Sequence, residues 1–485
     1  MIPAPGVLEL LLPSGRATRI VVLGSRCPPE LVPSVRGERG PIDLAVVAPD
    51  TAELREAGWL ESAMTRAGAL APEGLLFILL PPRLRGRAAR LLRSTGLEMA
   101  EPLLRHSGRG GDCGVVPLEP DALTAVMGSF IPLGGARRRL WTRGIRVPGV
   151  ARLLLRVHPT VIVVARRPHA GPLAAWALAA ESGATRVAVR SKHRGGRGSI
   201  VLACLGSQGA TGGVLKLATT GTVLDQPRLL RTVERITCLG PAARAAGARV
   251  PVARVVTTPA GLPVMAEHRI TGETALARLA RGAMAPQEAV SQLAEWLGRW
   301  HQTTAVPRVL DEARLEAEVL RPAAVVAPSL AGGAGYEAWL RERCRDLTGA
   351  RVPLVATHTD LTMSNVLLET GQAPGIVDWE ASRPEGLPLR DLWYAAADAE
   401  AAPGRYRDRL AAHQRSRLPS SPTGRLVAEA TERIRRALDL SPEFVTLCLH
   451  ACWLQHAADE QARRGADEAR PFLAIVGRIA GGRAA

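Results

Sequence analysis

Several residue types are nearly missing from this sequence. Its 485 residues include one asparagine, Asn365, and only two of its 62 basic residues are lysines, Lys192 and Lys216. Phe and Tyr are also scarce, at four and three residues. Lys and Arg are not interchangeable where the geometry of the charged group matters. The few Asn and Lys residues are therefore candidates for positions whose side-chain chemistry cannot be replaced.

Other absences exclude whole classes of protein. The seven cysteines include no CxxC pair, which argues against a zinc site and fits a reducing compartment. The N-terminus lacks the basic-then-apolar order of a signal peptide, and no stretch reaches the roughly 18 apolar residues of a spanning helix. We therefore expect a cytoplasmic protein without a membrane segment.

The net charge of +17 raises the question of nucleic-acid binding. The arginines are spread along the chain, with no long basic tail and no basic motif interleaved with aromatic residues. We expect no specific nucleic-acid partner. A basic surface that attracts a polyphosphate substrate explains the charge about as well.

Length and patterning predict two or three domains. Over residues 1–170, short apolar runs alternate with helical stretches, which predicts an α/β, Rossmann-like domain with a largely parallel sheet. The predicted strands are TRIVVLG, IDLAVVAP, GLLFILLPP and TVIVVARRP. A stretch with several Gly and Pro residues follows and predicts a linker over residues 171–182.

Residues 40–105 resemble the second half of a class I methyltransferase domain, in the order DLAVV, LESAMTRAGALAPEGLLFILLPP and ARLLRSTGLEMAEP. A methyltransferase also needs a glycine-rich turn after its first strand, so that the backbone can approach the cofactor. Here VVLGSRCPPELV supplies one Gly before Pro-Pro. We therefore favour a degenerate, non-catalytic domain that binds a partner or a substrate.

From residue 183 the pattern changes. The runs TRVAVRS, SIVLACLG and GVLKLATT predict three strands of an antiparallel meander. A long helix and two further strands, VARVVTT and LPVMAEHRI, come next, and helical patterns dominate from about residue 274 to the end.

The stretch HTDLTMSNVLLETGQAPGIVDWE, from residue 358, predicts a hairpin with chemistry at its open end. Asn365 precedes the run VLL and Asp378 follows the run GIV, so antiparallel pairing would place the two side chains together. An amide oxygen and a carboxylate suit Mg²⁺, which completes its coordination with water and phosphate oxygens. Asp360, on the loop just before, could accept a hydroxyl proton or orient the hydroxyl for attack on a γ-phosphate.

The motifs HTDLTMSN and IVDWE are similar to those of the aminoglycoside phosphotransferase and choline kinase family, small-molecule kinases with a protein-kinase-like fold. The resemblance implies that Asp360 is the catalytic aspartate, that Asn365 and Asp378 hold Mg²⁺, and that His358 buttresses the loop. In the later LPLRDLWYAAAD, Asp391 would brace the catalytic loop.

The resemblance also implies a division of the chain. Residues 183–272 would form the N-lobe, and residues 273–485 the mainly helical C-lobe, of an α+β bilobal domain. Family members often have Gly between the His and the Asp, where this chain has Thr359. We expect this change to affect backbone freedom and not catalysis.

A kinase-like fold needs a lysine on its third strand, held by an acid on the following helix. GVLKLATT places Lys216 on the third predicted strand of the meander, and Glu234 lies in the helix that follows. Lys216 is expected to neutralise phosphate charge. Glu234 is its predicted partner, although a solvated helix acid would look the same in sequence.

Two further segments are predicted to bind the nucleotide. In KHRGGRGS, Gly195, Gly196 and Gly198 could let backbone amides approach the phosphates, although a Gly-Arg turn needs no ligand. PVMAEHRITGETA resembles the strand and hinge between the two lobes, where the backbone of Glu267 and His268 would meet the adenine.

These features predict an ATP- and Mg²⁺-dependent kinase that phosphorylates a hydroxyl of a small molecule, such as an aminoglycoside-like antibiotic, an amino alcohol or a sugar derivative. The alternative is a pseudokinase that binds nucleotide and, with the N-terminal domain, serves as a scaffold for a partner protein. A third interpretation adds an active methyltransferase. The acids of the C-lobe that could meet a cationic acceptor are Glu380, Glu385, Asp398 and Glu400.

Overall fold

The computed structural model describes residues 7–27, 31–32, 40–107, 113–126, 144, 147, 150, 161–181, 183–194, 197–206, 211–220, 223–404 and 406–482. The chain divides into two compact units. The first, called here the sheet unit, is Met1–Leu230 with Ala253–Arg269; the second, the helical unit, is Arg231–Val252 with Ile270–Ala485. The domain boundaries expected from sequence remain predictions.

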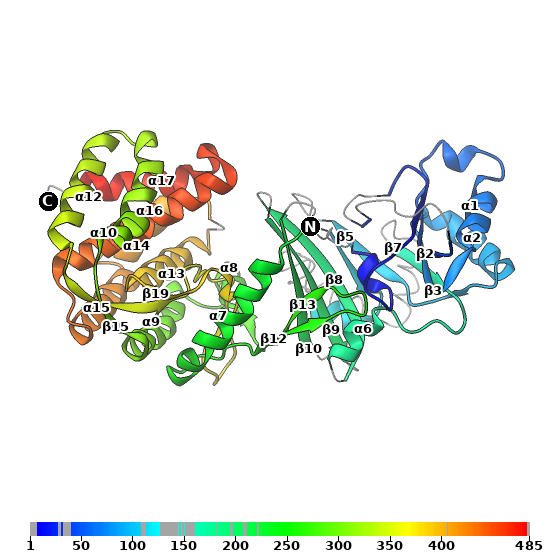
Figure 1. Ribbon diagram of the computed structural model, residues 1–485, viewed down its shortest axis with the longest axis horizontal. Helices are drawn as coiled ribbons and strands as arrows, with labels where there is room; N and C mark the ends of the chain where they lie inside the picture. Colours follow the sequence, from blue (N-terminus) through cyan, green and yellow to red (C-terminus); the bar gives the residue numbers. More distant parts are fainter. Residues whose placement is uncertain are drawn as a thin grey trace. The chain divides into compact units, whose positions relative to one another are not determined.

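The sheet unit contains one extended sheet, seen in blue to green in Figure 1. Its strands in spatial order are β1 (Ile20–Leu23), β2 (Ile42–Val47), β3 (Leu70–Ile78), β7 (Val161–Arg166), β5 (Leu103–Ser107), β6 (Cys113–Pro117), β8 (Ala184–Arg194), β9 (Arg197–Gly206), β10 (Thr211–Thr220), β13 (Pro263–His268) and β12 (Ala253–Thr257). The short strands β4 (Glu98–Met99) and β11 (Val223–Leu224) pair with β7 and β10.

The sheet is parallel only at its first three strands, which corrects the expectation of a largely parallel sheet. β1, β2 and β3 run parallel, with α1 (Trp59–Ala67) and α2 (Pro82–Ser94) following β2 and β3. β7 is antiparallel to β3 and β5, and β5 is antiparallel to β6. Only five residues separate β5 from β6, and so short a connection permits antiparallel pairing alone.

The α/β region and the meander share a ladder and a core. β6 pairs with β8 in the register Val115↔Val189, which joins the first region to the antiparallel strands β8, β9 and β10. One apolar cluster runs from Leu44 and Phe77 to Leu215 and Val264. The predicted linker contains α6 (Ala175–Ala180), whose Trp176 is buried in this cluster.

α7 (Gln226–Ala245) leads from the sheet unit into the helical unit. The other helices of that unit are α8 (Ala275–Ala280), α9 (Pro286–Thr304), α10 (Glu312–Leu315), α11 (Arg321–Val326), α12 (Gly333–Leu347), α13 (Arg390–Ala401), α14 (Arg409–Arg417), α15 (Pro422–Ala437), α16 (Pro442–Arg464) and α17 (Ala466–Gly481). A π-helical turn, η5 (Glu316–Leu320), joins α10 to α11.

Two small antiparallel sheets position the predicted site. One has the order β14 (Glu273–Thr274), β17 (Val366–Leu368) and β18 (Gly375–Ile376), and the other β15 (Val306–Val309), β16 (Arg351–Thr357) and β19 (Arg383–Gly386). The fold class is thus an α/β region followed by an α+β region, as predicted. Among the described residues no helix has both the length and the apolar character needed to cross a membrane.

Candidate active site

The predicted hairpin is present. β17 pairs antiparallel with β18 in the register Val366↔Ile376, and the Val377 amide donates to the Asn365 carbonyl at 3.0 Å. This last bond closes the open end of the hairpin beside Asp378. The prediction that the strands bring Asn365 and Asp378 to the same end is therefore confirmed at the level of the backbone.

Asp360 lies against Asn365. The Asn365 Nδ2 donates to the Asp360 carbonyl at 2.9 Å and to its Oδ2 at 3.4 Å. Burial, followed by the negative charge of Asp378, raises the pKa of Asp360 to about 7. A carboxyl whose pKa lies near neutrality is suited to accept a proton from a hydroxyl at physiological pH.

Asp391 fixes the loop that carries Asp360. Its two carboxylate oxygens accept from the amides of His358, at 2.7 Å, and Thr359, at 2.8 Å. Asp391 is itself buried, near the start of α13. Because hydrogen bonds to a charged group are stronger than neutral ones, a buried carboxylate with two amide donors holds the backbone firmly.

Thr359 adopts a left-handed conformation, with φ of 64°. This conformation is costly for a β-branched residue and is the reason that Gly suits the position. Here the amide bond to Asp391 and a bond from the Thr359 Oγ1 to the Ala381 carbonyl, at 2.8 Å, hold the residue in place. The chain thus keeps the turn without glycine.

His358 connects the catalytic loop to the hairpin. Its ring is fully buried, contacts Trp379 with a centroid distance of 5.2 Å, and places Nε2 3.1 Å from the Val377 carbonyl. Burial lowers its pKa below the ordinary value. A neutral, enclosed imidazole acts as a spacer between loop and hairpin, which fits the predicted buttress.

Sequence reasoning missed how Asp398 serves this site. The buried Asp398 accepts from the Met363 amide at 2.8 Å and from the Tyr406 hydroxyl at 3.2 Å, so it holds the loop between Asp360 and Asn365. Burial raises its pKa. The spacing of Asp391 and Asp398 places both on one face of α13, two turns apart, which is the signal that could have identified it.

The acids considered for a cationic acceptor mostly have partners inside the chain. Glu385 accepts from Arg308 and Arg314, and Glu400 accepts from Arg415 and Thr423. Asp398 also lies 3.6 Å from Arg409. Of Glu380, the backbone carbonyl accepts from Arg235. The interpretation of these carboxylates as free substrate contacts is therefore not favoured.

Asn365 and Asp378 fit a magnesium ion. Because the Asn365 nitrogen donates to Asp360, the amide oxygen is left as a ligand. The Asp378 carboxylate is exposed, and within the described part of the chain it receives no hydrogen bond. In that part of the chain, no group of three or more His, Cys, Asp or Glu side chains is placed to hold a metal ion. A site of this kind would be completed by water and phosphate oxygens.

In the sheet unit, Lys216 forms an ion pair that the sequence did not predict. Its Nζ lies 2.6 Å from the Oε2 of Glu267, a buried side chain on β13. Lys216 on β10 is opposite Met265, so Glu267, two residues on, points to the same face. Glu267 was predicted for its backbone at the hinge, and its carboxylate is an additional, unforeseen feature.

The other predicted nucleotide contacts are only partly described. Glu234 is an exposed residue of α7. His268 is exposed at the end of β13, and Gly198 is buried in β9, opposite Thr219 on β10. Gly195 and Gly196 lie outside the described residues. Their roles remain predictions.

Residues 213–427 match the model of the phosphotransferase enzyme family. This region is similar to the phosphotransferase enzyme family. The match contains Lys216, Asp360, Asn365 and Asp378, and it confirms the resemblance inferred from the motifs. No curated protein matched the chain.

Solved structures with similarity to the chain include the GDP complex of wild-type aminoglycoside 2'-phosphotransferase-IIIa, at 13% identity and a TM-score of 0.36, covering 61% of this chain and 93% of that one. A macrolide 2'-phosphotransferase from Brachybacterium faecium has 18% identity, coverage of 57% and 87%, and a TM-score of 0.35. An ethanolamine kinase from Plasmodium vivax has 13% identity, coverage of 60% and 82%, and a TM-score of 0.35.

The α/β region lies outside the phosphotransferase-family match. At the carboxyl end of its parallel strands, where ligands of such sheets bind, Ser25, Asp50 and Glu53 bond to one another. A cavity of about 740 Å³ opens instead beside Thr18, Asp43 and other residues near the amino ends of these strands. This arrangement favours the non-catalytic interpretation of the region.

Proposed function

We propose that the chain transfers the γ-phosphate of ATP to a hydroxyl of a small molecule, with Mg²⁺ as cofactor. One observation carries the proposal: Asp360, Asn365 and Asp378 converge at one end of a hairpin within the region that matches the phosphotransferase family. The acceptor would be an aminoglycoside-like antibiotic, an amino alcohol or a sugar derivative. Reduced thiols at all seven cysteines fit action in the cytoplasm.

Asp360 would orient the acceptor hydroxyl and take its proton as the acceptor oxygen bonds to the γ-phosphorus of ATP, while the bond from that phosphorus to the bridging oxygen breaks and ADP leaves. Asn365 and Asp378 would hold the magnesium ion, which would supply positive charge to neutralise the phosphates. Lys216, oriented by Glu267, would add a positive charge to the phosphates. Catalysis would rest on positioning and electrostatics, because phosphoryl transfer asks little covalent chemistry of the protein.

The second candidate is a pseudokinase that binds nucleotide and works with the α/β region as a scaffold. Among the described residues at the carboxyl edge of the α/β region, Ser25, Asp50 and Glu53 bond to one another, which supports this alternative. An intact set of Asp360, Asn365 and Asp378 opposes it, because a protein that only binds nucleotide has no need of Asp360.

The proposal is tested by Mg²⁺-dependent ATP consumption with a panel of aminoglycosides, amino alcohols and sugars. The variant is Asp378→Ala. Asp439→Ala is a matched control, since Asp439 is also exposed and left-handed, with φ of 52°, outside the site. We expect acceptor-stimulated turnover in the wild type and the control, and a loss of at least about 100-fold in Asp378→Ala.

Two other results have distinct meanings. Equal turnover in Asp378→Ala and the wild type would remove Asp378 from the metal site. No stimulated turnover in any protein, together with Mg·ATP binding that weakens in Asp378→Ala alone, would favour the pseudokinase.

A further inference from the structure

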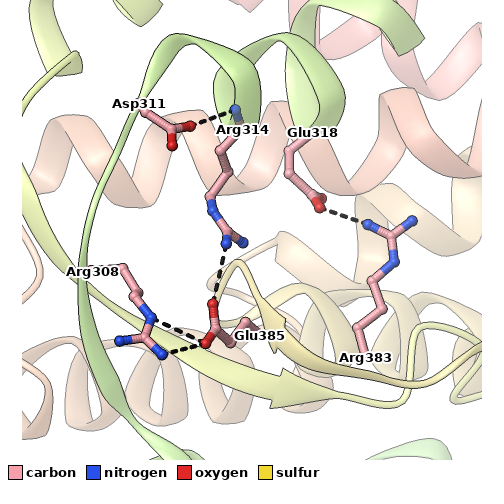
Figure 2. A network of polar contacts seen from close by, with 6 residues as sticks. All are labelled: Arg308, Asp311, Arg314, Glu318, Arg383 and Glu385. Carbon is pink, nitrogen blue, oxygen red and sulfur yellow. Dashed lines mark hydrogen bonds and ion pairs between the residues drawn. The ribbon is translucent and has the colours of Figure 1, made fainter.

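A buried carboxylate, Glu318, lies on the π-helical turn η5 between α10 and α11. Its Oε1 accepts from the Arg383 Nη1 at 2.6 Å, and its Oε2 accepts from the Arg390 Nη1 at 2.7 Å. Figure 2 shows the bond to Arg383. π-Helical turns are rare in proteins, and those that occur are often found at functional sites. This turn directs the Glu318 carboxylate toward Arg383 and Arg390.

The two arginines delimit the segment that joins the two halves of the candidate site. Arg383 begins β19, five residues after Asp378. Arg390 begins α13, and the next residue, Asp391, holds the amides of His358 and Thr359. The Glu318 carboxylate therefore holds both ends of the segment 383–390. This segment starts shortly after the β17–β18 hairpin and ends beside Asp391, which fixes the loop that carries Asp360.

A hydrogen bond also connects the residue before Arg390 to the helix α9. Leu389, with φ of 69°, donates from its amide to the Nε2 of the buried His301, at 3.2 Å. A left-handed, non-glycine residue just before Arg390 is a costly conformation that the surroundings must maintain. The ion pair of Arg390 and Glu318, in which both side chains are less than one-tenth exposed, supplies such a constraint.

We propose that Glu318 is a positioning residue, which sets the geometry of Asp378 and Asp360 through Arg383 and Arg390. This inference rests on the proposed function, because it assigns Glu318 to the same metal–nucleotide site. A buried ion pair is poor evidence for stability, since apolar residues of similar volume often stabilise as well. What the ionic arrangement adds is direction: two arginines are held in fixed orientation by one planar group.

The same face of β19 offers an internal comparison. Glu385, two residues after Arg383, accepts from Arg308 and Arg314, and Figure 2 shows this second group beside the first. Both arginines of the Glu385 group come from the 308–314 segment, so they tie β19 to one neighbour. The Glu318 group alone connects β19 to α13 and thereby to Asp391.

The test measures Mn²⁺ binding in the presence of ADP by isothermal titration calorimetry, on the full chain. Glu318→Gln is compared with Glu432→Gln, because Glu432 is also held by two arginines, Arg435 and Arg436, but on the exposed surface of α15. We expect Mn²⁺ affinity to fall by about tenfold or more in Glu318→Gln, the range found for partners that orient metal ligands. Glu432→Gln should stay within twofold of the wild type.

Arg383→Met provides a milder variant, because Arg383 is 38% exposed and its loss leaves the Glu318–Arg390 pair intact. We expect its Mn²⁺ affinity to fall by about threefold, with a wild-type near-ultraviolet circular dichroism spectrum. Arg436→Met is its control. The pair of variants keeps the proposal testable if Glu318→Gln does not fold.

Turnover with the acceptor supplies the second readout: kcat, corrected for the folded fraction measured by near-ultraviolet circular dichroism, should fall in Glu318→Gln while the KM for the acceptor stays within twofold. The correction is needed because loss of folded protein by itself lowers the apparent kcat and leaves KM unchanged. Wild-type Mn²⁺ affinity in a folded Glu318→Gln, or in Arg383→Met if that variant alone folds, overturns the positioning role and leaves the proposed function standing. Absence of Mn²⁺·ADP binding in the wild type overturns both.

Discussion

The two compact units differ in what they bury. Among the described residues of the sheet unit, the buried acids, histidines and arginines are Glu9, Arg85 and Glu267. In the helical unit the corresponding residues are His301, Glu318, His358, Arg390, Asp391, Asp398, His413, His450 and Glu460. The sheet unit is held mainly by apolar side chains, whereas the helical unit encloses ionisable groups that are bonded to backbone amides and to one another.

Several of the buried ionisable groups of the helical unit lie at its candidate site. Burying an ionisable group costs free energy unless hydrogen bonds compensate, and the net gain from each bond is small. The helical unit meets this cost at Asp391 and Asp398, whose carboxylates accept hydrogen bonds from amides on either side of Asp360 and so fix its loop. The sheet unit is stabilised mainly by apolar packing, which does not orient individual polar groups as hydrogen bonds do. The ion pair of Lys216 with Glu267 is the main exception.

We expect the largest loss of turnover when Asp360 of the helical unit is replaced, and no loss when Asp50 of the sheet unit is replaced. Asp360→Asn should lower turnover by a factor of about 10² to 10⁴, the usual contribution of a positioned general base. Asp50→Asn, at the carboxyl end of β2, should leave turnover unchanged. Steady-state kinetics of the two purified variants measures both. A comparable loss in Asp50→Asn would break the comparison, because it would place chemistry in the α/β region.

The next effect concerns acid stability. Burial lowers the pKa of His413 to about 3. Between pH 6.5 and 3 the unfolded chain binds a proton there and the folded chain does not, so the free energy of unfolding decreases as the pH falls through this window. From pH 7 to pH 4 this residue should account for a loss of about 3 kcal/mol.

Urea denaturation of the wild type and His413→Phe at pH 7 and pH 4 measures this contribution. Phe preserves the edge contact that the ring makes with Trp453, at a centroid distance of 4.6 Å. The variant should lose less stability on acidification than the wild type. His169→Phe, an exposed position in the sheet unit, is the control. Identical pH dependence in His413→Phe and the wild type would contradict the role of burial.

A smaller effect tests the exception in the sheet unit. Glu267→Gln removes the charge that orients Lys216, and we expect the KM for ATP to rise about tenfold, which corresponds to about 1.4 kcal/mol. Glu234→Gln changes the acid predicted from sequence, at an exposed position of α7. A greater rise in Glu234→Gln than in Glu267→Gln would restore the helix acid as the partner of Lys216.

The last prediction is that the full chain does not bind S-adenosylmethionine. S-adenosylmethionine titrated into the full chain should produce no binding heat in calorimetry, because Gly24, directly after β1, packs against the Ala48 carbonyl and Ser25, Asp50 and Glu53 bond to one another. ATP with Mg²⁺ serves as the positive control. Saturable heat with S-adenosylmethionine would reinstate the methyltransferase interpretation.

Local patterns predicted the elements that carry the site. The hairpin of β17 and β18, the meander of β8, β9 and β10 and the long helix α7 follow from short-range periodicity and turn residues, which a sequence displays directly. Family motifs then assigned Asp360 and its neighbours. These features need no knowledge of which distant segments meet.

Features that depend on register or on helix orientation could not be predicted. The pairing of Lys216 with Glu267 requires the relative register of β10 and β13. Glu318 lies in a helical sequence, 72 residues before Arg390, where any acid looks like a solvated one. The junction of β6 with β8 crosses a segment that reads as a linker. In each case the deciding contact is long-range.

The pairing of β6 with β8 affects how this protein can be truncated. A fragment starting at residue 183 would leave β8 with an unpaired edge and would remove most of the buried residues of the apolar cluster to which β9 and β10 contribute. Exposed, long edge strands template aggregation. The α/β region therefore supports the strand that carries Lys216, and recombination or expression trials should keep it together with β8, β9, β10, β12 and β13.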